Sequence, residues 1–214
     1  MKKIIAIPLL LVFLCAVPAY GGQPTQTLKV GLDELLTVLK DPQYATEEGV
    51  SDEHLEALRG VVFNFFDFGE LTRRAVGKTW TTFTDDQRER LVKVFTKLLE
   101  KTYIRKLNTQ FLEELNGFDG KSIQYLEEKV QGKLAMVNTK LKLTDKELAV
   151  DFKLISKQDK WWVYDIIGEG LTLLGIYKDD FRSALLKQTP DELIASLEQR
   201  IKDIEAGRAD AQAQ

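Results

Sequence analysis

The sequence predicts an α+β fold in which helices cover one face of a curved, mainly antiparallel sheet of about four strands. Three observations support this fold class. Apolar residues recur at helical spacing from residue 28 to 115, alternate at strand spacing from 123 to 167, and return to helical spacing from 171 to 205. The chain has 214 residues, of which 44% are hydrophobic, and this is enough for one sizeable core.

The amino terminus is expected to be a cleaved secretory signal covering residues 1–19. Lys2 and Lys3 precede an uncharged apolar run that ends near Pro18 and Ala19. This run is too short for a comfortable transmembrane helix. Cleavage is expected after Ala19, and cleavage after Gly21 is nearly as plausible. We therefore expect a single domain over residues 20–206, exported and without cysteine, followed by a disordered tail over residues 207–214.

Four helices are predicted before the strands. Leu28, Leu32, Leu35 and Leu39 share one helical face, which ends before Pro42. Ser51 can cap a second helix, and a third runs from Asp67 to Val76 with Gly77 as its stop. The longest helix is predicted over residues 85–115, opened by a capping box of Thr84 and Gln87.

Strands and two more helices follow. A weak strand is predicted near residues 123–130, and stronger ones near 135–143, 148–154 and 161–167. Their short connections favour sequential antiparallel pairing. Helices are then predicted over residues 171–186 and 190–205, the latter announced by Thr189, Pro190 and Glu192.

The composition excludes most catalytic chemistry. A net charge of -3 gives no global positive field to hold nucleic acid, and one His and one Cys leave little for metal or Ser-His-Asp sites. Gly168-Glu169-Gly170 lacks the Lys and the further glycines of a phosphate-binding loop. Tyr164 and Asp165 could support proton transfer on a buried ligand. Adjacent residues of a strand point to opposite faces of the sheet, however, so the two side chains could line one pocket only if the strand contained a bulge. We therefore predict no enzyme, cofactor or metal site, and a surface position for His54.

The long predicted helix carries a row of basic residues on its outer side. These residues, each four apart, are Lys93, Lys97, Lys101 and Arg105. Such a row is commonly a solvated helix surface. The functional alternative is partner docking, in which the row meets an acidic protein surface or anionic lipid headgroups.

Three segments in order carry a family resemblance. These are Phe66–Trp80, Trp161–Asp165 and Glu169–Leu173, with similarity also at Phe95 and Tyr103. Together they strongly resemble the MlaC or toluene-tolerance family (Ttg2-like) of periplasmic phospholipid-binding proteins that assist an ABC transporter. The resemblance spans most of the chain that follows the signal.

The resemblance implies a fold similar to nuclear transport factor 2, with an apolar cavity that holds the acyl chains of a phospholipid. It further implies a periplasmic location. The protein would shuttle lipid between the outer and inner membranes, and so maintain outer-membrane lipid asymmetry, together with two partners. One partner is an inner-membrane ABC transporter complex with an MCE-domain protein, and the other is an outer-membrane lipoprotein-porin complex. The competing prediction is a periplasmic chaperone or adaptor that binds an apolar peptide or lipoprotein.

The expected lipid-binding residues are apolar positions where helices should face the sheet. Each such position is more often ordinary core than cavity wall, because any core requires apolar stripes of this kind. They are Phe66, Phe68, Leu71, Trp80, Phe95, Leu99, Tyr103, Val137, Leu141, Val150, Phe152, Val163, Leu171, Leu174 and Tyr177.

Overall fold

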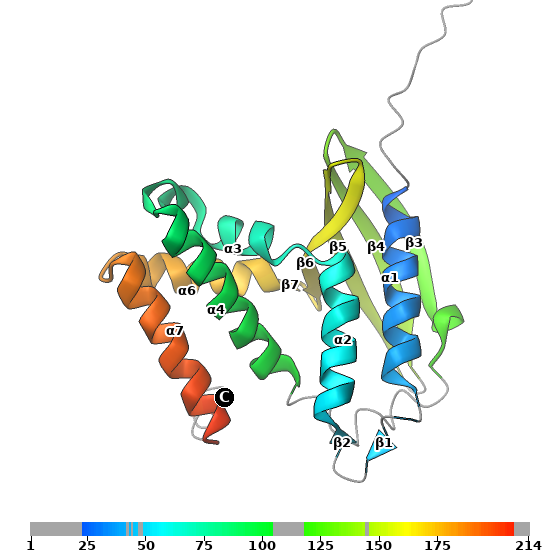
Figure 1. Cartoon of the computed structure of the whole chain (residues 1–214). Helices are drawn as coiled ribbons and strands as arrows, with labels where there is room; N and C mark the ends of the chain where they lie inside the picture. The colour runs from blue at the N-terminus through cyan, green and yellow to red at the C-terminus, as the bar shows by residue number, and fades with distance from the viewer. Residues whose placement is uncertain are drawn as a thin grey trace, which may run out of the picture.

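The computed structural model describes residues 23–41, 43, 45–46, 49–104, 118–143 and 146–207. It confirms the α+β class, with helices packed on an antiparallel sheet (Figure 1). The predicted signal, the part of the predicted long helix from Arg105 on, and all of the predicted tail after Gly207 lie outside the described residues.

The sheet is a meander of sequential antiparallel strands. It comprises β3 (Ile123–Gln131), β4 (Leu134–Lys142), β5 (Glu147–Lys157), β6 (Lys160–Gly168) and the short β7 (Leu171–Thr172), in that order. The four predicted strands are thus present, and β7 adds a two-residue fifth. A separate two-stranded pair, β1 (Ala45–Thr46) with β2 (Gly49–Val50), lies before the second helix.

Two helices lie against the sheet. They are α1 (Pro24–Leu39), which contacts β3, β4 and β6, and α2 (Asp52–Phe65), which contacts α1 and β6 (Figure 1). Ser51 caps α2 as predicted, accepting a hydrogen bond from the His54 backbone N–H at 3.2 Å. Gly31 permits the close approach of the two helices, because a Cβ at this position would lie 2.7 Å from the Phe65 ring.

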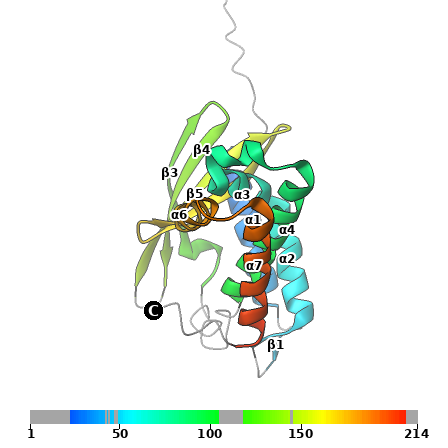
Figure 2. The same cartoon turned by 90° about the vertical axis from the view of Figure 1, so that its left-hand side faces the viewer.

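The remaining helices form a second group beside the sheet. They are α3 (Phe68–Val76), the 3-10 helix η2 (Gly77–Thr82), α4 (Asp85–Ile104), α6 (Leu173–Leu185) and α7 (Pro190–Glu205). Helix α4 packs along α7 and α3 packs on α6 (Figures 1 and 2). The Phe95 ring meets the rings of Tyr177 and Phe181 edge-on at 4.6 and 4.9 Å, which joins α4 to α6 in the core. A short 3-10 turn, η3 (Gly120–Ser122), precedes β3.

Two sequence expectations are corrected. The predicted helix at residue 171 begins at Leu173, because Leu171 and Thr172 first pair with β6 and the Thr172 hydroxyl then accepts from the Gly175 N–H at 2.6 Å. His54 is only 2% exposed and is not a surface residue. Its Nε2 lies 2.9 Å from the carbonyl oxygen of Val38, because the first turn of α2 packs against the end of α1.

Strand β6 contains a bulge at Tyr164. Lys153 pairs with Asp165, whereas the next residue, Leu154, pairs with Val163. Tyr164 is therefore the extra residue, and it breaks the alternation of faces. As a result Val163, Tyr164 and Asp165 are all buried, at 0%, 5% and 0% exposed.

Candidate functional site

An apolar cavity of about 390 Å³ lies between α1, α2, α4 and the sheet. Its walls combine one face of α1 and α2 with the last described turns of α4 and with residues of β6 and α6. Most of the lining side chains are aliphatic or aromatic. They are Leu35, Leu39, Leu55, Leu58, Arg59, Val62, Phe63, Phe66, Phe68, Thr96, Leu99, Glu100, Tyr103, Ile166 and Leu173. Such a surface accepts hydrocarbon and offers few hydrogen bonds.

Tyr103 stands at this cavity with an uncharged hydroxyl. Burial raises its pKa above the usual value, and a hydrogen bond with Tyr177 offsets only part of that rise. Burial likewise raises the pKa of Tyr177 to about 12. Both phenols therefore remain neutral at physiological pH, which keeps negative charge away from this part of the wall.

A larger open groove of about 1070 Å³ adjoins the cavity on its outer side. It runs between α4 and the turn that joins β5 to β6, and Lys157, Gln158 and Trp162 belong to its second wall. Phe63, Phe66 and Phe68 line both the groove and the cavity. The Phe68 ring lies 5.0 Å from that of Phe63 and 4.7 Å from that of Phe66, so the two hollows share an aromatic floor.

An ion pair spans the place where the two hollows meet. Arg59 of α2 donates through two nitrogens to Glu100 of α4, with Nε 3.0 Å from Oε2, and it also pairs with Glu56. Hydrogen bonding to Glu100 raises the pKa of the Arg59 guanidinium, against the opposing effect of burial. Arg59 and Glu100 line both hollows, so the pair ties α2 to α4 across their junction.

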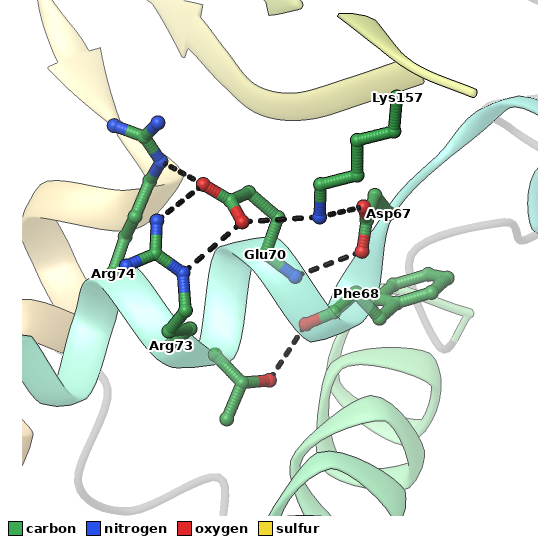
Figure 3. Close-up of polar contacts among 7 residues, drawn as sticks. Asp67, Phe68, Glu70, Arg73, Arg74 and Lys157 are labelled. Carbon is green, nitrogen blue, oxygen red and sulfur yellow. Dashed lines mark hydrogen bonds and ion pairs between the residues drawn. The ribbon is translucent and has the colours of Figure 1, made fainter. Parts of the chain in front are cut away.

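The groove is bordered by a charged cluster at the start of α3 (Figure 3). Glu70 is 4% exposed and accepts from Arg73, Arg74 and Lys157, with shortest distances of 2.6, 2.7 and 3.1 Å. Burial opposes its ionisation, yet the hydrogen bonds from the three cations prevail and lower the pKa of Glu70 to about 2. Asp67 caps α3 and also accepts from Lys157, at 2.7 Å.

This cluster fixes the β5–β6 turn against α3. Lys157 loses hydration on burial, which lowers its pKa, but its bonds to Asp67 and Glu70 prevail and the pKa is raised. The Asp67 N–H donates to the Val163 carbonyl oxygen at 2.7 Å, which attaches the same corner to β6. The cluster therefore positions one wall of the groove.

Tyr164 and Asp165, the pair weighed as an enzyme-like site, have structural partners. The buried Asp165 carboxylate accepts from Lys153 Nζ and from the Leu174 N–H, each at 2.9 Å. The Arg74 guanidinium lies over the Tyr164 ring, 4.3 Å from its centroid. Neither residue lines the cavity or the groove.

The expected lipid-binding residues fall into four groups. Phe66, Phe68, Leu99 and Tyr103 line the cavity. Core positions are held by Leu71, Phe95, Val137, Phe152, Val163 and Tyr177. Trp80, Val150 and Leu174 are partly buried against that core, and Leu141 packs on a smaller cluster with Phe118 and Ile123. Leu171 is 67% exposed, since β7 places it at the sheet edge.

The contribution of α1 and α2 to the cavity was not predicted from the sequence. Leu35, Leu39, Leu55, Leu58 and Val62 lie on helical faces that the spacing predicts to be buried. That spacing does not separate a residue facing a cavity from one facing solid core. Among the expected docking residues, Lys93 and Lys97 are exposed on α4 and border the groove together with Lys101. Arg105 lies outside the described residues.

Within the residues that the structure describes, no three His, Cys, Asp or Glu side chains gather as metal ligands would. No helix in the same part of the chain has both the length and the apolar character needed to span a bilayer.

The fold is an α+β domain with an apolar cavity between its helices and its sheet. The model of the MlaC family, described as MlaC protein, matches residues 30–199, which is most of the chain. The chain therefore belongs to the MlaC family.

Two relatives illustrate the similarity. The intermembrane phospholipid transport system binding protein MlaC of Haemophilus influenzae is 24% identical over 132 residues, covering 59% of this chain and 58% of that protein. The alignment thus spans little more than half of that relative. A phospholipid-binding protein from Ralstonia solanacearum, solved in complex with a phospholipid, is 21% identical and matches with a TM-score of 0.72 over 86% of this chain and 99% of that chain. This likeness shows that the two share a fold.

Proposed function

We propose that this protein is a periplasmic phospholipid carrier that holds acyl chains in its apolar cavity. The supporting observation is the cavity of about 390 Å³, bounded by α1, α2, α4 and the sheet and opening beside a basic groove. Membership of the MlaC family and the phospholipid named for both relatives are consistent with this ligand. The chain is a carrier rather than an enzyme in this proposal.

A carrier is needed because lipid escapes a bilayer very slowly. Two acyl chains contain about 30 methylenes, and exposing them to water at about 0.8 kcal/mol each opposes release by roughly 24 kcal/mol. An apolar cavity recovers most of this free energy, and so does a bilayer. Lipid therefore exchanges between the two environments with a small difference in free energy, and direction has to come from partner proteins.

The proposed partners are those that the family resemblance implies. The carrier would shuttle lipid between an outer-membrane lipoprotein-porin complex and an inner-membrane ABC transporter complex with an MCE-domain protein, and so maintain outer-membrane lipid asymmetry. The exposed basic residues of α4, Lys93 and Lys97, are available for a charged contact at the mouth of the site.

A cavity-filling substitution tests the ligand. In Val62→Trp, the added indole would occupy the cavity that Val62 lines, so the variant should retain little diacyl lipid. The matched control is Val30→Trp, since Val30 is 55% exposed on α1 and lines neither hollow. The measurement is mass analysis of an organic extract of each purified protein, with thermal melting to show that both still unfold cooperatively.

The outcomes separate the carrier from its competitor. Diacyl lipid bound at near-unit occupancy in the wild type and the control, and lost from Val62→Trp, supports the carrier. A bound peptide in place of lipid supports a chaperone or adaptor instead. Equal lipid in all three proteins contradicts the placement of the acyl chains in this cavity.

A further inference from the structure

The groove outside the cavity carries more positive than negative side chains. Among the described residues its lining contains the cations Arg59, Arg88, Lys93, Lys97, Lys101 and Lys157, against the acids Asp67, Glu89 and Glu100. This excess stands out in a chain whose overall net charge is -3. Four acids outside the lining, Glu56, Glu70, Asp85 and Glu205, also pair with cations of the groove, so the charge offered to a ligand depends on which cations remain exposed.

Most of these cations already have close partners. Arg59 is held by Glu100 and Glu56, and Lys157 by Asp67 and Glu70. Arg88 pairs with Asp85 and donates to the Trp80 carbonyl oxygen. Their charge is largely committed within the protein.

Lys93 and Lys97 differ from the other cations of the groove because their side chains are exposed, whereas Lys101 is only partly exposed and pairs with Glu205 at 3.4 Å. Lys93 forms no ion pair with any described residue, and Lys97 lies 3.7 Å from the Glu205 carboxylate in a pair whose two side chains are 55% and 42% exposed. They stand four residues apart, so their Cβ atoms lie about 5–6 Å from each other on one face of α4. Two exposed ammonium groups at this spacing, one with no ion pair among the described residues and one in a solvent-exposed pair, can bind one phosphate group together.

The groove is also continuous with the cavity. The residues that line both are Arg59, Phe63, Phe66, Phe68, Thr96 and Glu100. Thr96, which lines both hollows, directly precedes Lys97 in the chain, so the basic residues and the cavity wall share one stretch of α4. A cavity of about 390 Å³ lies toward the small end of the about 300–1,000 Å³ found for ligand sites, so a two-chain lipid would extend out of it into the groove.

We propose that the groove is the seat of the lipid headgroup, with its phosphate held by Lys93 and Lys97. The carrier then prefers phospholipids whose headgroup is net anionic over zwitterionic ones with the same acyl chains. A zwitterionic headgroup brings its own ammonium group next to these two exposed lysines, and the repulsion between like charges opposes binding. The inference rests on the proposed carrier function, and it adds a class of lipid and the two residues that select it.

The test is competition between two lipids that differ only in headgroup. Purified protein is incubated with vesicles containing equal amounts of phosphatidylglycerol and phosphatidylcholine with identical acyl chains, then separated and extracted for mass analysis. We expect the wild type to retain more phosphatidylglycerol, by up to about fivefold, which is the upper end of what exposed charge pairs give. The ratio should fall toward one as salt is raised, because the groove is open to solvent.

Charge-neutralising variants assign the preference to the two lysines. Lys93→Gln combined with Lys97→Gln should bring the ratio close to one while the total lipid per protein is kept. Lys93→Gln alone should lower it partway, and this variant removes no described ion pair. The matched control is Lys133→Gln with Lys187→Gln, the same change of charge at two exposed lysines that border neither hollow.

The possible failures are distinguishable. Equal retention of the two lipids by the wild type overturns the inference and leaves the carrier function standing. A double variant that keeps the wild-type ratio of the two lipids at full lipid occupancy also overturns the inference and leaves the carrier function standing. The two lysines would then be assigned to docking with an acidic protein partner. A wild type that retains no diacyl lipid under any condition overturns both proposals.

Discussion

Burial and the neighbouring cations shift the pKa of the Glu70 carboxyl group in opposite directions. The side chain is 4% exposed, a position where an isolated carboxylate would be strongly disfavoured. Arg73, Arg74 and Lys157 all donate to it, and Lys157 comes from the distant end of β5, beside the β5–β6 turn (Figure 3). A buried charge is tolerated here because it is fully paired, and the pairing attaches that turn to α3.

The low pKa of Glu70 makes stability depend on pH in a defined window. A carboxyl whose pKa falls from 4.5 to about 2 on folding stabilises the native state above about pH 4.5, and this contribution is lost as the pH falls toward 2. Glu70→Gln should lower the free energy of unfolding by about 2 kcal/mol at neutral pH. The difference between the two proteins in free energy of unfolding should become smaller by about pH 3, because the wild-type carboxylate then begins to lose its charge.

Denaturant unfolding of the two proteins at several pH values measures this difference. The matched control is Glu198→Gln, since Glu198 is exposed on α7 and forms no ion pair with the described residues. It should leave stability nearly unchanged at every pH. A Glu70→Gln defect that is as large at low pH as at neutral pH would contradict the role of the ionised carboxylate.

At residue scale, the sequence predicted local caps better than long-range partners. Ser51 and Thr189 cap their helices as their spacing predicts, because an N-cap depends on residues only a turn away. The burial of His54 and Asp165 was not predicted, because it depends on α1 and on a bulge in β6 that brings distant segments together. Neither feature has a signature in local spacing.

Helix α4 connects the core to the candidate site. Leu91 and Phe95 are fully buried, Leu99 is 4% exposed at the cavity wall, and Tyr103 is 40% exposed at its edge. These residues recur every four positions, and such a row drifts around a helix of 3.6 residues per turn. The row of apolar side chains therefore faces solid core at the start of α4 and the cavity near its end. The row itself was predicted from the sequence, but the cavity that its later residues face was not.

The ion pair between α2 and α4 should control how readily the cavity opens. Arg59 and Glu100 are 38% and 17% exposed, so Glu100→Gln should cost at most about 1 kcal/mol of stability. If lipid passes between α2 and α4, losing this ion pair makes separation of the two helices easier by the same free energy. Lipid exchange should then become about fivefold faster. The measurement is the rate at which labelled lipid leaves the loaded protein for excess vesicles.

Glu56→Gln is the matched control for this rate. Glu56 is the other acid paired with Arg59, but both residues lie on α2, so their pair does not join two helices. Its removal should leave the exchange rate near that of wild type. An equal increase in the two variants would show that the bridge to α4 is not what limits release.

For the whole molecule, the order of helices, strands and helices was sufficient to predict the architecture. The short connections at Gly132 and Gln158-Asp159 correctly predict sequential antiparallel pairing, which the register of β3 to β6 confirms. The cavity could not be predicted from apolar spacing, because a stripe facing a cavity and a stripe facing core have the same composition. Only the relative placement of α1, α2, α4 and the sheet distinguishes them.

The proposed carrier should transfer lipid passively and equally in both directions. The sequence carries no glycine-rich phosphate loop, and the cavity and a bilayer offer hydrocarbon tails similar environments, so the protein alone supplies no free energy to drive net transport. Labelled lipid should move between donor and acceptor vesicles of the same composition at equal rates when their roles are exchanged, with no nucleotide present. Val62→Trp should reduce this transfer, while Val30→Trp should not. Transfer that requires ATP, with hydrolysis by the purified chain alone, would contradict the proposal, because energy would then enter through this protein rather than through a membrane partner.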